Sequence, residues 1–277
     1  MELQIVDTKF GKVEYVSRGN GNPILFLHGG HSNCHETLFH KGFNLDEYRL
    51  ITPSRPGYGK TPLNKNDTLK SAARLIVSFL DTLGVNTVVL YAISAAGPTA
   101  MHLAANYPER IHKLVLASAV TQCWLPKNSG IYRAAKLLFN PKVEWITWGA
   151  VRLFSPLFPN LIAKNFHSQF SLSKSHDILK TDVYELLSTF KHFRSKRGFL
   201  SDIEHKINDD IARKISIPTI IVHSKNDNSV SFDHALHAQR LIENSRLIGL
   251  DNKWGHMFWI GNDANDTTEK IIDFIAS

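Results

Sequence analysis

The amino-acid sequence predicts an α/β protein with a mostly parallel, eight-stranded sheet flanked by helices, and with a helical insertion late in the chain. Short apolar runs alternate with segments of helical periodicity before residue 122 and again after residue 200. This alternation is typical of a parallel sheet covered by helices. Residues 122–200 differ in composition, because they hold 12 Lys or Arg against 4 Asp or Glu, and 13 of the 28 aromatic residues. The change indicates an inserted module.

Hydrophobic periodicity and turn residues place the individual elements. Before the insertion we expect strands at residues 3–8, 13–18, 24–27 and 49–52, a helix at 67–83, a strand at 87–92, a helix at 95–107 and a strand at 113–117. After it we expect a strand at 219–223, a helix at 232–242, a strand at 246–250 and a helix at 267–275. Asp67 is the expected N-cap of the first helix, and Gly84 its end.

Composition and charge exclude several classes of protein. With 277 residues, 43% of them hydrophobic, the chain can bury a large core and is not disordered, collagen-like or a coiled coil. Its net charge of +7 is local, because the chain outside residues 122–200 has 20 Lys or Arg against 21 Asp or Glu. Two cysteines, Cys34 and Cys123, form neither a disulfide framework nor a zinc spacing. Without a signal-peptide pattern at its N-terminus, the chain is expected in the cytoplasm.

A serine stands where an apolar strand is predicted to meet a helix. Residues 88–93 are apolar, Ser94 follows, and Ala92 and Ala96 stand two positions before and after it. A nucleophile on a sharp strand-to-helix turn needs small neighbours there, because a larger side chain would clash across the turn. The free N–H groups of the following helix would favour the negative charge that develops in acyl transfer. On this pattern alone, a buried serine packed between strand and helix is the better explanation.

Four further motifs change that interpretation. They are His28-Gly29-Gly30-His31 after an early strand, Arg55-Pro56-Gly57-Tyr58-Gly59 after the next, Asp227 after a late strand, and Gly255-His256 before the last helix. The ordered set resembles the α/β-hydrolase fold family from residue 3 to residue 275, and Ser, Asp, His is the family's order. The resemblance implies a hydrolase core at residues 1–121 and 201–277 with a helical cap, or lid, domain at residues 122–200.

The resemblance and the chemistry of the side chains together suggest roles. Ser94 would be the nucleophile, and His256 the base that takes its proton and then protonates the leaving group. Asp227 would accept a hydrogen bond from His256. The backbone N–H groups of Gly30 and Ala95, with His31 as a further candidate, would form the oxyanion hole. A serine here argues against epoxide hydrolases and haloalkane dehalogenases, which use aspartate, and no metal or organic cofactor is implied.

Competing explanations exist for several of these residues. Asp233 competes with Asp227 as the acid, but it fits the first turn of the following helix as a dipole partner. Residues 116–121, where some relatives carry the acid, hold none. His28 is expected to support the oxyanion loop by hydrogen bonding, and Arg55 to anchor its own loop. In most members of the family the strand-to-helix turn has glycine on both sides of the nucleophile. Ala92 and Ala96 stand there in this chain, so the turn does not assign it to one subfamily.

The aromatic residues of the insertion are expected to close an apolar pocket over the carboxyl edge of the sheet. The pocket residues that we predict are His28, Trp124, Trp145, Trp148 and Met257. The alternative is that most of the aromatic residues only pack the cap against the core. A solvated helix face is the favoured interpretation of the basic residues, ahead of an anionic substrate or a membrane-surface contact. The absence of a nucleic-acid-binding module argues against a nucleic-acid partner.

The sequence therefore predicts a serine hydrolase that cleaves a carboxylic ester or related acyl compound, with a hydrophobic or aromatic small-molecule substrate. A C–C bond hydrolase, a lactonase or a cofactor-free lyase using the same site is the alternative chemistry. A non-catalytic small-ligand receptor is the alternative of another class, because a fold does not fix a function. The substrate and the oligomeric state stay open.

Overall fold

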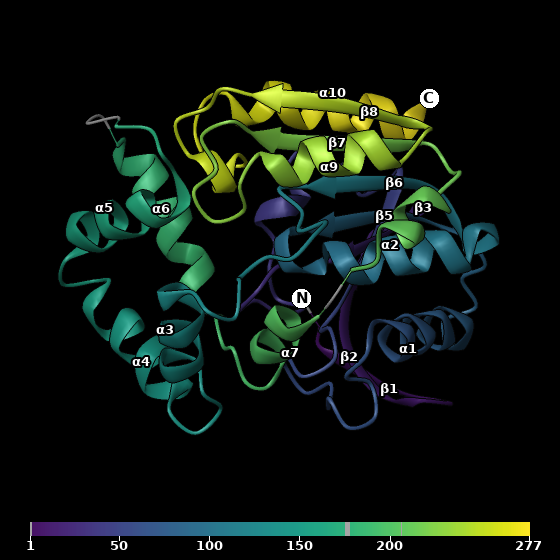
Figure 1. Ribbon diagram of the computed structural model, residues 1–277, viewed down its shortest axis with the longest axis horizontal. Helices are drawn as coiled ribbons and strands as arrows, with labels where there is room; N and C mark the ends of the chain where they lie inside the picture. Colours follow the sequence, from purple (N-terminus) through teal and green to yellow (C-terminus); the bar gives the residue numbers. More distant parts are fainter. Residues whose placement is uncertain (1, 175–177, 206) are drawn as a thin grey trace.

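The computed structural model describes residues 2–174, 178–205 and 207–277, and it confirms the predicted eight-stranded sheet (Figure 1). The strands are β1 (Gln4–Thr8), β2 (Gly11–Arg18), β3 (Asn22–Leu27), β4 (Tyr48–Pro53), β5 (Val88–Ile93), β6 (Ile111–Ala117), β7 (Thr219–Ser224) and β8 (Ser245–Leu250). The α-helices are α1 (Leu69–Thr82), α2 (Gly97–Asn106), α3 (Gly130–Leu138), α4 (Glu144–Phe154), α5 (Pro159–Phe170), α6 (Lys180–Phe190), α7 (Gly198–Glu204), α8 (Asp209–Arg213), α9 (Asp233–Leu241) and α10 (Ala264–Ala276).

The strand order β1-β2-β4-β3-β5-β6-β7-β8 brings the predicted site residues to one edge of the sheet. Strand β2 runs antiparallel to both of its neighbours, and all other neighbouring strands are parallel. Parallel strands end along the same edge, as the arrowheads of β6, β7 and β8 show in Figure 1. Ser94 directly follows β5, Asp227 follows β7 and His256 follows β8, so their loops meet there.

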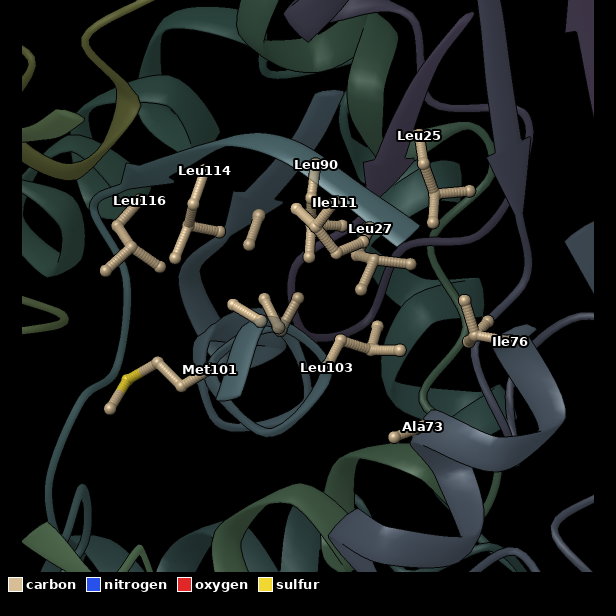
Figure 2. Packing of buried hydrophobic residues seen from close by; sticks show 14 of the residues in the cluster. Leu25, Leu27, Ala73, Ile76, Leu90, Met101, Leu103, Ile111, Leu114 and Leu116 are labelled. Atoms are coloured by element: carbon tan, nitrogen blue, oxygen red, sulfur yellow. The ribbon is translucent and has the colours of Figure 1, made fainter. Parts of the chain in front are cut away.

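Alternate residues of the buried strands pack on opposite faces of the sheet. Leu25 and Leu27 of β3 belong to the cluster that includes α1, α2 and α9, whereas Ile24 and Phe26 belong to the cluster that includes α10. Figure 2 shows leucines of β3, β5 and β6 facing Met101 and Leu103 of α2. The two layers of helices hold the sheet, and hence its loop-bearing edge, in place.

The N-cap of helix α1 lies one residue later than predicted. Thr68, not Asp67, is the N-cap, because its hydroxyl accepts from the Ser71 backbone N–H at 3.1 Å while the Ser71 hydroxyl accepts from the Thr68 backbone N–H. This reciprocal arrangement satisfies two otherwise unpaired N–H groups. Asp67 lacks a matching partner at the third helical position, which explains why its neighbour takes the cap.

Helices α3–α6 of the inserted segment gather beyond the carboxyl ends of the parallel strands (Figure 1). The predicted boundary at residue 200 falls inside α7, which is tied to the core. Asp202 of α7 accepts two hydrogen bonds from the buried Arg55 guanidinium, at 2.8 and 2.7 Å, and one from the Tyr58 hydroxyl. The division into two domains remains a prediction. Among the described residues, every helix is too short or too polar to cross a membrane.

Candidate active site

Ser94 lies at a sharp turn between β5 and α2. Its φ of +52° is unusual for a residue with a side chain and costs on the order of 1–2 kcal/mol. A short 3₁₀ turn, Ser94–Ala96, joins it to α2. The backbone N–H of Val120 donates to the Ser94 carbonyl at 2.9 Å, and Ala92 and Ala96 are fully buried. The surrounding contacts therefore hold the strained backbone in place.

The Ser94 and His256 side chains lie within hydrogen-bond distance. Ser94 Oγ is 3.1 Å from His256 Nε2, and His256 Nδ1 is 2.7 Å from Asp227 Oδ2. A carboxylate only accepts, so the proton of the imidazole lies on Nδ1 and donates to Asp227. Nε2 is then free to accept the Ser94 hydroxyl proton, which is the tautomer that a general base requires. All three side chains are buried.

Both carboxylate oxygens of Asp227 have hydrogen-bond donors. Oδ1 accepts from the backbone N–H groups of Ser229 and Val230, each at 2.8 Å. Oδ2 faces His256 and, at 3.2 Å, the Nε2 of His223. The same His223 nitrogen lies 2.8 Å from the Val230 carbonyl oxygen. Because Nε2 faces two acceptors, we assign the ring proton of His223 to Nε2. Asp227 is therefore held in one orientation.

The pKa of Asp227 is lowered although the group is buried. Burial acts to raise this pKa, but the charge of His256 and the hydrogen bonds from His223 and His256 outweigh it. The carboxylate consequently stays ionised through the range in which an imidazole titrates. An ionised Asp227 can stabilise the imidazolium that forms when His256 takes a proton.

The loop that carries His256 depends on Gly255. Its φ is +54°, and a Cβ placed there would come within 2.4 Å of the Phe170 carbonyl oxygen and 2.6 Å of that of Asn226. Both neighbours are backbone atoms that cannot rotate away. Glycine is thus required for both conformation and space, which explains why Gly255 precedes the histidine.

The predicted oxyanion loop after β3 lies beside the serine turn. A Cβ placed on Gly29 would be 3.2 Å from Ser94 Cβ, and one placed on Gly30 would be 3.8 Å from Ala95 Cβ. Gly30 and Ala95 are therefore neighbours in space, as a shared oxyanion hole would require. Ala95 also stands in the 3₁₀ turn that leads into α2, where free N–H groups favour negative charge.

The third predicted contributor, His31, is tied to the inserted segment through its side chain. Its Nδ1 is 2.7 Å from Ser195 Oγ, and its ring centroid lies 3.9 Å from that of Phe199 and 4.2 Å from that of Phe139. Burial lowers the pKa of His31 to about 3, so the ring stays neutral. The His31 side chain therefore ties this loop to the inserted segment.

The predicted pocket residues are placed differently from one another. Met257 is buried next to His256, and Trp148 is buried with its indole N–H donating to Ser195 Oγ at 2.8 Å. Trp124 is half-buried and donates to the Ser229 carbonyl in the Asp227 loop. Trp145, in contrast, is 55% exposed, and its indole N–H donates to the Lys142 carbonyl. Trp145 is therefore not a pocket residue.

His28 also lies outside any pocket. It is fully buried, its Nδ1 is 2.8 Å from the Gly29 carbonyl oxygen, and its Nε2 accepts from the Arg55 backbone N–H at 2.9 Å. Burial and the nearby Arg55 charge lower its pKa well below the usual range. With both ring nitrogens engaged, His28 holds together the two loops behind the site.

Three residues near the site are not indicated by the sequence patterns. Phe170 stacks near His256, with ring centroids 6.0 Å apart, and Phe199 lies against Gly30. Their sequence positions carry no motif that would distinguish them from other aromatic residues of the insertion. His223 belongs to β7 and is indistinguishable in sequence from a strand residue. Its position four residues before Asp227 is the one signal that was available.

Comparisons with known proteins identify the family of the chain. A family model described as alpha/beta hydrolase fold matches residues 22–263. An uncharacterized hydrolase, YcgS, of Bacillus subtilis is 35% identical over 273 residues, which cover 96% of each chain. A 2-hydroxy-6-oxononadienedioate/2-hydroxy-6-oxononatrienedioate hydrolase of Burkholderia vietnamiensis is 35% identical over 119 residues, or 40% of this chain and 41% of that one.

The fold comparison gives the same result. An alpha/beta hydrolase fold protein from Nakamurella multipartita superposes with a TM-score of 0.81 at 24% identity, covering 99% of this chain and 98% of that one. The chain belongs to the α/β-hydrolase fold family. Its full-length relative YcgS is a hydrolase by name, and no finer activity follows from the likeness.

Proposed function

We propose that the protein is a serine hydrolase that cleaves a carboxylic ester or related acyl compound through an acyl-serine intermediate. One observation carries the proposal. Ser94 has a backbone φ of +52°, and its hydroxyl lies 3.1 Å from the His256 imidazole. The other nitrogen of that imidazole is 2.7 Å from the buried Asp227 carboxylate. A nucleophile, its base and the group that orients the base are thus in the contact order that acyl transfer requires.

In the proposed mechanism His256 Nε2 removes the Ser94 proton as Oγ attacks the acyl carbon. The imidazolium is stabilised by Asp227, and the carbonyl oxygen gains negative charge beside the N–H groups of Gly30 and Ala95. His256 then protonates the leaving alcohol, which leaves the acyl group on Ser94. Water, deprotonated by the same imidazole, attacks this ester and releases the acid and the free serine.

The surroundings of Ser94 support an apolar acyl group. Phe170, Phe199 and Met257 lie around the two catalytic side chains, and Ser94 and His256 are only 5% and 6% exposed. Apolar walls with a few directed polar groups are typical of sites for hydrophobic small molecules. The small exposure favours short or flat acyl groups over bulky ones.

A panel of p-nitrophenyl esters of increasing acyl length tests the proposal. We expect hydrolysis by the wild type, with short acyl chains preferred, and loss of turnover in Ser94→Ala. Absence of hydrolysis across the panel by folded protein would instead favour a small-ligand receptor on this fold. Turnover that persists in Ser94→Ala would contradict the assignment of the nucleophile.

C–C bond hydrolysis is the second candidate, and the part-chain match to the Burkholderia vietnamiensis hydrolase favours it over the remaining alternatives. The same serine and histidine can act on a carbonyl flanked by carbon instead of oxygen. A 2-hydroxy-6-oxo-dienoate offered beside the esters distinguishes the two. If the enzyme consumes the dienoate with a higher kcat/KM than the best ester, and this activity depends on Ser94, C–C bond hydrolysis would replace the esterase proposal.

A further inference from the structure

Large apolar side chains stand exposed on the outer helices of the inserted segment. Leu157 and Leu161 are 63% and 65% exposed, and Trp145, Ile146, Leu153 and Phe158 are exposed as well. They follow one another along α4, the short connection after it, and the first turn of α5. Figure 1 shows α4 and α5 at the end of the molecule away from the C-terminus and the core helices. We call these six residues the outer apolar face.

Helix α4 is apolar on its inner and its outer side. Trp148 and Ser155 face inward and are buried, whereas Ile146 and Leu153, seven residues apart and so on one side of the helix, are exposed. A helix that is hydrophobic all round is normally buried all round. Packing within the chain therefore explains only the inner side of α4.

The connection between α4 and α5 extends the same face. The rings of Phe154 and Phe158 lie 6.4 Å apart, and Leu157 stands exposed between them in sequence. Prolines at positions 156 and 159 fix this short connection. Large exposed apolar side chains gathered in one segment are typical of an interaction site.

The exposed charges of residues 122–174, the stretch that carries the outer apolar face, are of one sign. The stretch 122–174, which the structure describes throughout, contains a single acidic residue, Glu144, and this is buried in an ion pair with Arg194. Arg133, Lys142 and Lys164 are exposed, and each lacks an ion-pair partner among the described residues. The segment that carries the outer apolar face thus has exposed cations and no exposed carboxylate of its own.

We propose that the outer apolar face docks on an anionic lipid surface. Apolar side chains can enter the boundary of headgroups and acyl chains while the neighbouring lysines and arginines pair with lipid phosphates, and this needs no membrane-spanning helix. A second copy of the chain fits less well, because two faces with the same positive charge would repel each other. A purely solvated face accounts for the cations but leaves the exposed leucines and Trp145 without a reason.

Vesicle co-sedimentation tests the proposal. The full chain should bind vesicles of phosphatidylcholine and phosphatidylglycerol in equal parts, bind pure phosphatidylcholine far more weakly, and dissociate as salt rises from about 0.05 to 0.5 M. Each lysine or arginine near such a surface contributes about fivefold to binding, so replacing Arg133, Lys142 and Lys164 together by Glu should reduce it on the order of 100-fold or more. The matched control changes Lys65, Lys214 and Lys270, exposed on the core, to Glu and should bind nearly as well as the wild type.

The apolar contribution has its own variant and its own spectroscopic readout. Leu157→Asp should reduce binding at least tenfold, whereas Leu236→Asp, at an exposed leucine on α9, should leave it unchanged. Trp145 fluorescence should shift to the blue on adding the anionic vesicles, and Trp145→Phe should abolish the shift while binding persists.

Three outcomes would overturn the proposal. The first is failure of the wild type to bind the mixed vesicles at low salt. The second is an equal loss of binding in Leu157→Asp and Leu236→Asp. The third is a wild-type dimer in sedimentation equilibrium that Leu157→Asp dissociates, together with no binding of the wild type to vesicles. The last outcome would assign the face to self-association. Thermal melts of each variant distinguish a lost contact from a lost fold.

Discussion

Replacing Asp227 by Asn should convert His256 to the wrong tautomer. Two backbone N–H groups, of Ser229 and Val230, point at Oδ1, so the amide oxygen of an asparagine must take that position. The amide NH₂ is then placed where Oδ2 lies, 2.7 Å from His256 Nδ1. Two N–H groups cannot share this hydrogen bond, and the imidazole has to move its proton to Nε2. Ser94 then loses its base.

The expected loss of kcat in Asp227→Asn is about 10⁴-fold, or about 5 kcal/mol of transition-state stabilisation. Steady-state hydrolysis of the best p-nitrophenyl ester measures it, and circular dichroism melts report the fold. Asp233→Asn is the matched control, because Asp233 is exposed in the first turn of α9 and should be dispensable. A kcat within tenfold of the wild type in Asp227→Asn would refute the reasoning, as would an equal loss in Asp233→Asn.

Three further predictions concern stability, measured by urea denaturation. Gly255→Ala should lower the free energy of unfolding by about 2 kcal/mol or more and reduce activity. Gly84→Ala, where φ is +65° but the space is open, should lower it by about 1 kcal/mol. Equal losses in the two variants would contradict the predicted clash at Gly255. Asp202→Ala leaves the Arg55 charge buried and should cost about 3–5 kcal/mol, most of which Arg55→Met combined with Asp202→Leu should restore. Burial raises the pKa of Glu36 to about 7, so the folded chain holds a proton that the unfolded chain releases above about 4.5, and stability falls as pH rises through that window. Glu36→Gln should therefore stabilise by about 3 kcal/mol at pH 8 and hardly at pH 4, and an equal gain at both would exclude this cause.

The motifs in the sequence and the family resemblance they carry predicted that Ser94, Asp227 and His256 lie together, and the structure places them in contact. Ser94 directly follows a strand, Asp227 and His256 stand in the loops after two later strands, and the ends of parallel strands share one edge. The choice of these three residues also rested on the resemblance to the α/β-hydrolase fold family, and it was independent of the path of residues 122–200. The catalytic roles of the three side chains remain proposals until they are measured.

The surroundings of these side chains could not be predicted in the same way. Helix α4 is apolar on two sides, so its sequence does not reveal that Trp148 turns inward while Trp145 turns outward. Phe170 and Phe199 reach the site through the path of the inserted chain, which no local pattern encodes. Where one partner residue decides, as Ser71 does for the Thr68 cap, neighbouring candidates such as Asp67 look equally suitable in sequence.

Mapping the adduct of a fluorophosphonate probe tests the central claim most directly. The folded protein is incubated with the probe, digested, and its peptides are analysed by mass spectrometry. The account predicts one dominant adduct on Ser94, no corresponding adduct in Ser94→Ala, and much slower labelling in His256→Ala. An adduct on another serine, or labelling of Ser94→Ala at the wild-type rate, would contradict the assignment of Ser94 as the nucleophile.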